Sequence, residues 1–445
     1  MKSIKNPIVL NLFLFIVTLC LHLLLPPSEP AKWNNYADCK DYLAQSKIPL
    51  SSLEFYAPHK REGFYPRPFT VPLIYKIAGS EPEHIIIAQK IIHSLTTLFL
   101  VFALLQFFQK QRTKIFIIIS MYLLLSWWNI FGWTFILLSE SLSISLMFCW
   151  IASYLLMIKK RSVISVIIHL CLTFLFSFTR DSWPYIFIFF YLLNLFICWF
   201  LDKELVRKLT LLLTFSLLIF VVQKQTAKIG NRYRLPIINT IILRILPNDE
   251  FLKEFTDARM PDANRLKKDF SQVSPYDSSI NLVFNLYNDT SYASFHHWVT
   301  TDGEKTYMKF LISHPRYFLL LDEGLQKSKR VFCFNNCYSG NVVGYSYLAQ
   351  YLFPIYNTLS VLLLFVLLLF TKQRKNYFLS LIGTLIAVFA INALLSYNAD
   401  TFEVERHLFI TNIVIQFLGI LLTALLFDWI SISSDEFSEN KIDQL

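Results

Sequence analysis

Ten stretches of the chain are apolar and long enough to cross, or nearly cross, a lipid bilayer, and this feature limits the fold more than any other. A transmembrane helix needs about 20 predominantly apolar residues. Of the 445 residues, 55% are hydrophobic and 16% are charged, whereas about a quarter of the residues in a soluble domain are charged. The sequence therefore predicts an all-α polytopic membrane protein with about ten transmembrane helices, at residues 7–26, 84–108, 115–135, 136–158, 162–180, 183–201, 208–223, 351–371, 378–397 and 408–429.

The short basic connectors between these segments predict how the chain is oriented. "MKSIKN", "QKQRTK", "KKR", "DKELVRK" and "KQRK" are separated by pairs of apolar segments, so all five fall on one side of the membrane. Cytoplasmic loops carry an excess of Lys and Arg. We therefore expect both termini in the cytoplasm. The first apolar run is expected to remain as a helix rather than to be removed as a signal peptide, because no small-residue cleavage site closes it.

Two segments on the opposite side are too long to be simple turns, and both are rich in Pro, Asp, Asn and Tyr. The first is the outer loop at 27–83. We expect four regions: an N-terminal transmembrane region at 1–223 that includes this loop, an extracytoplasmic segment at 224–350, a C-terminal transmembrane region at 351–430, and a polar, disordered cytoplasmic tail at 431–445.

The extracytoplasmic segment contains two features of its own. Apolar residues recur at roughly helical spacing over 303–332, which predicts an amphipathic helix at the membrane interface, broken at Pro315. Cys333 and Cys337 lie on the side where a disulfide can persist, and the sequence does not decide between a disulfide, a metal pair and free thiols.

Charged side chains cluster at the expected outer ends of the helices. An ionisable residue at the centre of a bilayer costs at least about 2.5–3.5 kcal/mol, and less near the ends of a helix. Glu140 is notable because it lies in the apolar run "LLSESLSISL" without a basic neighbour. We expect it to pair with Arg180 or Arg406. The alternative is that Glu140 is solvated at a hairpin turn, and charges at helix ends also commonly extend to the interface without any further role.

Several short motifs then occur in a characteristic order. The first outer loop carries "DCKDYLA", from Asp38 to Ala44, and then "RPFTVPL", from Arg67 to Leu73. A Ser-Glu-Ser-Leu helix start, a Thr-Arg helix end and "EVERH" before the last apolar segment follow. In this order and on this side of the membrane, the motifs resemble the GT-C class of membrane glycosyltransferases, which includes the protein O-mannosyltransferases and the lipid A aminoarabinose transferases. The resemblance covers most of residues 1–210 and 350–430 in layout. It departs from the pattern at Thr70 and Val71, where relatives often have Gly-Tyr.

The resemblance implies transfer of a sugar from a polyprenyl-phosphate donor to a lipid, glycan or protein acceptor on the extracytoplasmic face, with inversion at the anomeric carbon. Asp38 matches the family position of the general base, and Asp41 is a second acid that would position the acceptor or bind a divalent cation. A carboxylate can take the proton of an attacking hydroxyl, and guanidinium groups suit a leaving phosphate. The expected substrate-binding residues are Arg67, Glu140, Arg180, Arg406 and His407. Low Gly with abundant Phe, Ile and Lys fits an AT-rich bacterium, so the expected location is the bacterial inner membrane.

Other interpretations of the same residues remain open. Asp38 is also suited to cap a helix that starts at Cys39. A lipid or solute transporter or flippase is a second functional hypothesis, although repeated halves and Gly-rich hinges are missing from the sequence. A non-catalytic assembly subunit is a third. No metal site is predicted, because the adjacent His296 and His297 lack further ligands. The net charge of +10 is spread over short clusters, which argues against nucleic acid as a partner.

Overall fold

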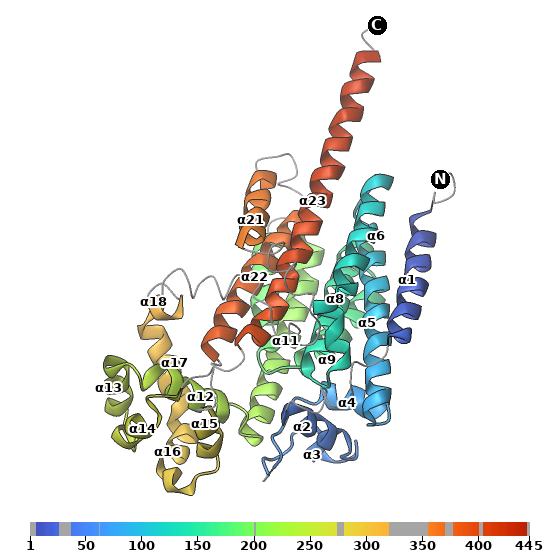
Figure 1. Cartoon of the computed structure of the whole chain (residues 1–445). Helices are drawn as coiled ribbons and strands as arrows, with labels where there is room; N and C mark the ends of the chain where they lie inside the picture. Colours follow the sequence, from blue (N-terminus) through green and yellow to red (C-terminus); the bar gives the residue numbers. More distant parts are fainter. Residues whose placement is uncertain are drawn as a thin grey trace.

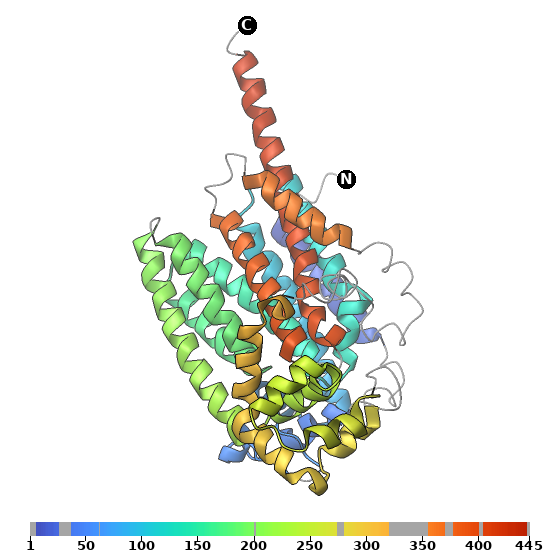
Figure 2. The same ribbon diagram turned by 90° about the vertical axis from the view of Figure 1, so that its left-hand side faces the viewer.

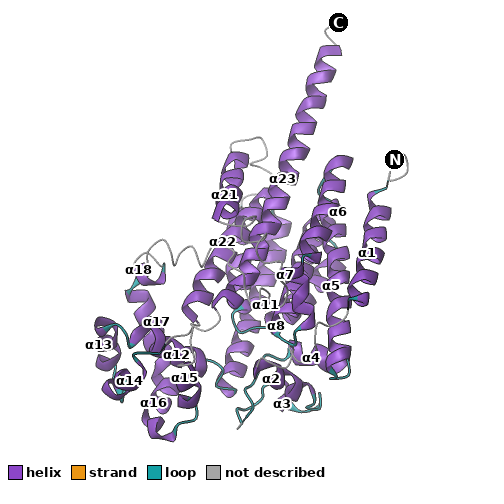
Figure 3. Ribbon diagram, viewed as in Figure 1, coloured by secondary structure: helices purple, strands orange, loops and turns teal. Residues whose placement is uncertain are grey.

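All ten predicted apolar segments are helical in the structure. A computed structural model describes residues 6–25, 37–61, 63–199, 202–273, 280–319, 355–369, 377–399 and 404–442. Within these ranges there are helices and loops but no β-strand, only an isolated bridge between Arg61 and Phe64 (Figure 3). The helices of the apolar segments are α1 (Pro7–Leu24), α5 (Pro82–Leu105), α6 (Gln111–Ser126), α8 (Ser139–Lys160), α9 (Val163–Ser177), α10 (Trp183–Cys198), α11 (Lys203–Ile229), α21 (Ile355–Leu369), α22 (Tyr377–Ala399) and α23 (Val404–Ile442).

Six of these helices are long and apolar enough to cross a membrane, which makes the chain an integral multi-pass membrane protein. They are α1, α5, α8, α11 and the apolar parts of α22 and α23. Helix α8 lies at the centre of the bundle, since 83% of its apolar window is buried and it packs against both α5 and α9. Ser recurs along α8, and such small residues let neighbouring helices approach closely in a membrane.

The predicted span at 115–135 is shorter in the structure. Helix α6 ends at Ser126, and the chain turns back through α7 (Trp128–Phe131) and the 3-10 helix η1 (Gly132–Phe135) before α8 begins. The turn is buried in the bundle, and Gln89 of α5 donates through Nε2 to the carbonyl oxygens of Thr134 and Ile136 at 3.2 and 3.3 Å. Non-helical backbone is tolerated at such depth when its polar groups have partners in the protein.

Two helices are longer in the structure than the sequence predicts: the one that contains the span at 208–223 and the last one. Helix α11 has 27 residues and runs to Ile229, beyond the expected boundary at 223. Its N-terminus is capped by Asp202, whose Oδ1 accepts from the backbone N–H groups of Glu204 and Leu205. Helix α23 continues to Ile442, so the tail that the sequence predicts to be disordered is mostly helical (Figure 1).

The extracytoplasmic segment of the prediction forms a helical subdomain, residues 234–318, with its own hydrophobic core. This core includes Phe255, Leu266, Phe295 and Phe310. A break at Pro315 is confirmed, because α17 ends at Ser313 and α18 begins at Pro315. Cys333 and Cys337 lie outside the described residues. The elements are α12 (Arg234–Thr240), η2 (Ile241–Ile245), α13 (Asp249–Asp257), α14 (Ala263–Phe270), α15 (Ile280–Leu286), η3 (Thr290–Tyr292), α16 (Ala293–Trp298), η4 (Val299–Gly303), α17 (Glu304–Ser313) and α18 (Pro315–Phe318).

The first loop folds into three short helices, α2 (Ala37–Ser46), α3 (Leu53–Tyr56) and α4 (Thr70–Ile77). It lies at the same end of the bundle as the helical subdomain, and both chain termini point the other way in two perpendicular views (Figures 1 and 2). The loop is anchored to the bundle by a hydrogen bond from Thr70 N to Phe178 O (3.2 Å) and by an apolar cluster of Phe55, Phe69, Phe178 and Ile219. This end of the bundle is called the α2 end below.

A substitution at Gly230 tests the contact between the first loop and the chain that follows α11. A Cβ atom added there would lie 3.0 Å from Pro66 Cβ and 3.2 Å from Pro58 O. We expect Gly230→Val to overpack this contact and to lower the free energy of unfolding by about 1–3 kcal/mol. Thermal unfolding in detergent measures the effect. Gly303→Ala is the control, since its Cβ would meet no atom closer than 3.5 Å; equal melting temperatures for the two variants would contradict the prediction.

Candidate functional site

Arg67 brings the two carboxylates of the first loop together. Asp38 and Asp41 lie three residues apart on α2 and therefore on one face of this helix. Arg67 Nη2 lies 2.5 Å from Asp38 Oδ1 and 2.8 Å from Asp41 Oδ2. Asp38 lies in the first turn of α2, which begins at Ala37, so the expected cap on a helix starting at Cys39 is wrong.

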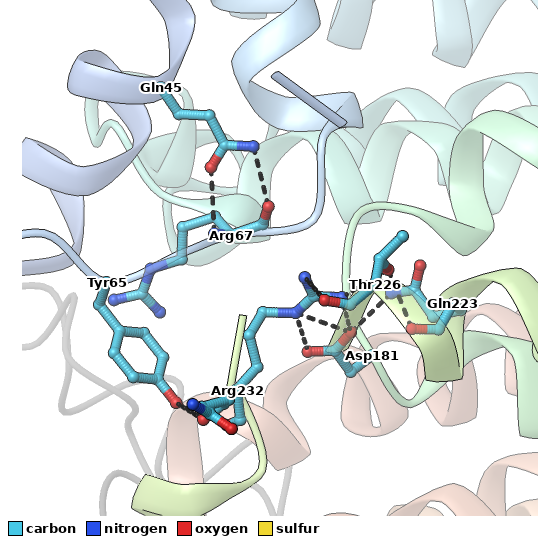
Figure 4. A network of polar contacts seen from close by, with 8 residues as sticks. Gln45, Tyr65, Arg67, Asp181, Gln223, Thr226 and Arg232 are labelled. Atoms are coloured by element: carbon cyan, nitrogen blue, oxygen red, sulfur yellow. Dashed lines mark hydrogen bonds and ion pairs between the residues drawn. The ribbon is translucent and has the colours of Figure 1, made fainter. Parts of the chain in front are cut away.

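The backbone and the guanidinium of Arg67 are both held in place (Figure 4). Gln45, on the last turn of α2, accepts from Arg67 N (3.0 Å) and donates to Arg67 O (2.9 Å). The guanidinium lies 5.5 Å from the ring centroid of Tyr42 and 5.1 Å from that of Tyr65. Its Nε is buried without a hydrogen-bond partner among the described residues. One nitrogen of this guanidinium is thus enclosed by protein atoms and forms no hydrogen bond with them.

The environments of the two carboxylates differ. Asp41 accepts from Tyr65 N (2.9 Å) as well as from Arg67, and its side chain is 10% exposed. Burial raises the pKa of Asp41, and the neighbouring Arg67 offsets part of this rise. The side chain of Asp38 is 25% exposed and is therefore the easier of the two for a second molecule to reach.

A second ion pair lies nearby in the bundle. Glu140, in the first turn of α8, pairs with Arg180, in the turn between α9 and α10, which confirms the expected partner. Glu140 is fully buried, and Arg180 Nε also donates to Ser139 Oγ (3.2 Å). The buried Tyr42 lies close to Glu140 and to Asp38. Burial raises the pKa of its hydroxyl, and the charges of Asp38 and Glu140 contribute to this rise.

A third ion pair joins the bundle to the chain that leads into the helical subdomain (Figure 4). Asp181 accepts from Arg232 Nε at 3.0 Å and Nη2 at 2.9 Å, and from Gln223 Nε2 at 2.7 Å. Arg232 also donates to Thr226 O (3.1 Å). The hydroxyl of Tyr65 donates to Arg232 O at 2.6 Å, so the residue whose backbone binds Asp41 also binds this chain.

The sequence analysis did not identify Gln45, Tyr65 and Arg232 as site residues. Their partners lie far away in the chain, and no local motif marks these three positions. The side chains of Arg406 and His407, at the start of α23, lie outside the described residues. Among the residues that the structure describes, no three His, Cys, Asp or Glu side chains gather as metal ligands would. No family model matches the chain, and no curated protein or solved structure is similar to it.

The Glu140–Arg180 pair yields a stability prediction. Arg180→Met removes the guanidinium from a fully buried carboxylate, which costs roughly 3–5 kcal/mol. Arg180→Met combined with Glu140→Leu is expected to recover much of this loss, because no unpaired charge then remains buried.

The control for this prediction is Arg161→Met. Arg161 is half-exposed and pairs with Asp202 and Glu204, so its loss is expected to change stability little. Unfolding in detergent micelles measures all three variants. Equal losses for Arg180→Met and Arg161→Met would show that the buried pair contributes no more than an exposed one.

Proposed function

We propose that this protein transfers a sugar from a polyprenyl-phosphate donor to an acceptor on the extracytoplasmic face of a membrane, as a GT-C-type glycosyltransferase. The observation that carries the proposal is the gathering of Asp38, Asp41 and Arg67 at the α2 end, next to the buried Glu140–Arg180 pair. Carboxylates and guanidinium groups are the side chains that such a transfer requires. A non-catalytic assembly subunit would have no need of this arrangement.

The proposed topology has ten crossings with both termini in the cytoplasm, most simply in a bacterial inner membrane. Two observations support it. Both chain termini lie at the end of the bundle opposite α2–α4 and the helical subdomain (Figure 1). The basic connectors 109–114 and 159–161 join helices at that same opposite end, where the positive-inside rule expects them. The candidate site then faces away from the cytoplasm.

In the proposed reaction Asp38 is the general base. The acceptor hydroxyl gives its proton to the Asp38 carboxylate while its oxygen forms a bond to the anomeric carbon. The bond from that carbon to the phosphate oxygen breaks, and polyprenyl phosphate leaves with the electron pair, so attack from the opposite face inverts the anomeric centre. The greater exposure of Asp38 favours it over Asp41, whose two oxygens are both engaged. Asp41 is then a positioning residue.

The negative charge on the leaving phosphate needs stabilisation. The guanidinium of Arg67 lies beside both carboxylates and is the group we assign to a phosphate oxygen. Its Nε has no hydrogen-bond partner in the described chain and is covered by protein atoms, so binding there requires these atoms to move. Arg180 is a second candidate for this role, held by Glu140. Arg406 and His407 remain proposed donors from the start of α23, and a divalent cation remains a proposed additional partner.

Asp38→Asn tests the general base. The amide cannot take a proton, so we expect the rate of sugar transfer to fall by about 10²–10⁴-fold. The measurement is turnover of radiolabelled lipid-linked sugar in membranes that contain equal amounts of each variant. Asp41→Asn is the matched control and is expected to lose less. Full activity of Asp38→Asn together with loss in Asp41→Asn would transfer the role to Asp41, and full activity of both would exclude a base from this loop.

The pH dependence of transfer tests the role of Asp41. Burial raises the pKa of Asp41 above the ordinary value of 3.8, so Asp41 gains a proton at a higher pH than a solvated Asp does. A protonated Asp41 has no negative charge and no longer forms an ion pair with Arg67. We expect transfer to fall on the acid side at a pH above 3.8. In Asp41→Asn this acid limb is expected to move to lower pH, since the titrating group is gone. An acid limb at the same pH in both proteins would contradict this assignment.

A further inference from the structure

A cavity of about 290 Å³ lies between the first loop and the helical subdomain. Its walls include Lys40, Asp41, Lys60, Arg61, Tyr65 and Tyr287. The described walls come from the first loop and from the subdomain, and among the residues that the structure describes none from the apolar helices lines the cavity. Small-molecule sites begin at about 300 Å³, so the cavity matches a small polar ligand.

The cavity carries an excess of positive charge. Arg234 precedes the lining residue Leu235 and donates through Nη2 to the carbonyl oxygen of Tyr287, another lining residue, at 3.0 Å. Lys60 lies close enough to Arg234 that the pKa of Lys60 is lowered, first by burial and then by that guanidinium. His296 lies beside the same two cations, and its pKa is lowered by burial and by them.

The described carboxylates near the cavity contact groups other than Lys60 and Arg234, although Asp289 lies close to His296. Asp41 binds Arg67, Glu54 pairs with Arg61, and Asp289 accepts from the backbone N–H of Ser291 at 2.8 Å. Within the described part of the chain, no carboxylate forms an ion pair with Lys60 or Arg234. Partly buried cations that lack a counter-charge repel one another, and an anion in the cavity would relieve this repulsion.

We propose that this cavity binds an anionic group, a phosphate or a carboxylate, of the acceptor that receives the sugar. The assignment to the acceptor rests on the proposed function. The donor is unsuitable, because an isoprenoid chain requires apolar helices beside its phosphate, and no described residue of these helices lines the cavity. Asp41 forms part of the wall and binds Arg67, which also binds Asp38, so a ligand anchored here lies next to the carboxylates.

The first test is direct binding to the purified full-length protein in lipid nanodiscs. The probes are inorganic phosphate, glucose 6-phosphate, glucuronic acid and uncharged glucose, titrated by isothermal titration calorimetry. We expect the charged probes to bind more tightly than glucose. We expect Lys60→Gln and Arg234→Gln to raise the Kd of the charged probes at least about tenfold, since each removes a charge-assisted hydrogen bond. A preference for glucose 6-phosphate or for glucuronic acid distinguishes phosphate from carboxylate.

Three controls accompany this test. Lys268→Gln removes an exposed lysine of the same subdomain and should leave every Kd unchanged. Lys60→Arg keeps the charge and should keep the binding. The melting temperature of Lys60→Gln should stay equal to that of the wild type or rise, because a crowded cation is removed. Charged probes that fail to bind, or that bind all variants equally, would overturn the proposal.

A second measurement separates this inference from the proposed function. In a transfer assay, Lys60→Gln is expected to raise the KM for an anionic acceptor while the KM for the lipid-linked donor stays constant. Anion binding without any sugar transfer would leave the cavity as an anion site and overturn the proposed function alone. Transfer with unchanged acceptor KM in Lys60→Gln would overturn the cavity assignment alone.

Discussion

The structure at the α2 end depends on the cost of burying a charge beside an apolar helix bundle. A carboxylate that is removed from water needs a cation nearby or becomes protonated. The buried Glu140 pairs with Arg180, and the buried Arg232 pairs with Asp181, whose side chain is 42% exposed. In each case the partner comes from a different element. These pairs connect the start of α8, the α9–α10 turn and the chain after α11. Charge pairing therefore determines how these segments lie relative to one another, in addition to apolar packing.

The fold could be predicted where composition alone decides it. Each of the ten apolar segments is helical, because an apolar stretch in a membrane has to satisfy its backbone internally. The end of α6 could not be predicted from the local sequence. The turn that follows it is held by Gln89, which lies 45 and 47 residues before its partners Thr134 and Ile136. The C-terminal end of α11 was predicted at residue 223, six residues too early, for another reason. Its last turns, up to Ile229, consist mostly of polar residues, and they continue the helix beyond the apolar run.

The candidate site was predictable only in part. Glu140 in an apolar run requires a partner. This requirement pointed to Arg180 or Arg406, and the structure shows the pair with Arg180. Gln45, Tyr65 and Arg232 resemble ordinary solvated residues of a loop in the sequence. The hydrogen bond from Tyr65 to Arg232 O joins residues 167 positions apart, and no local pattern reports such a contact. Tyr65 is nevertheless the residue that links the carboxylates of the first loop to the helical subdomain.

The turn between α9 and α10 presents two opposite charges in consecutive positions. Arg180 contacts Glu140 in the bundle, and Asp181 contacts Arg232 at the entrance to the subdomain. Interchanging these two residues would leave composition, net charge and hydropathy untouched. It would also oppose like charges at both contacts simultaneously. Residue order within a single dipeptide thus governs whether two distant parts of the chain attract or repel.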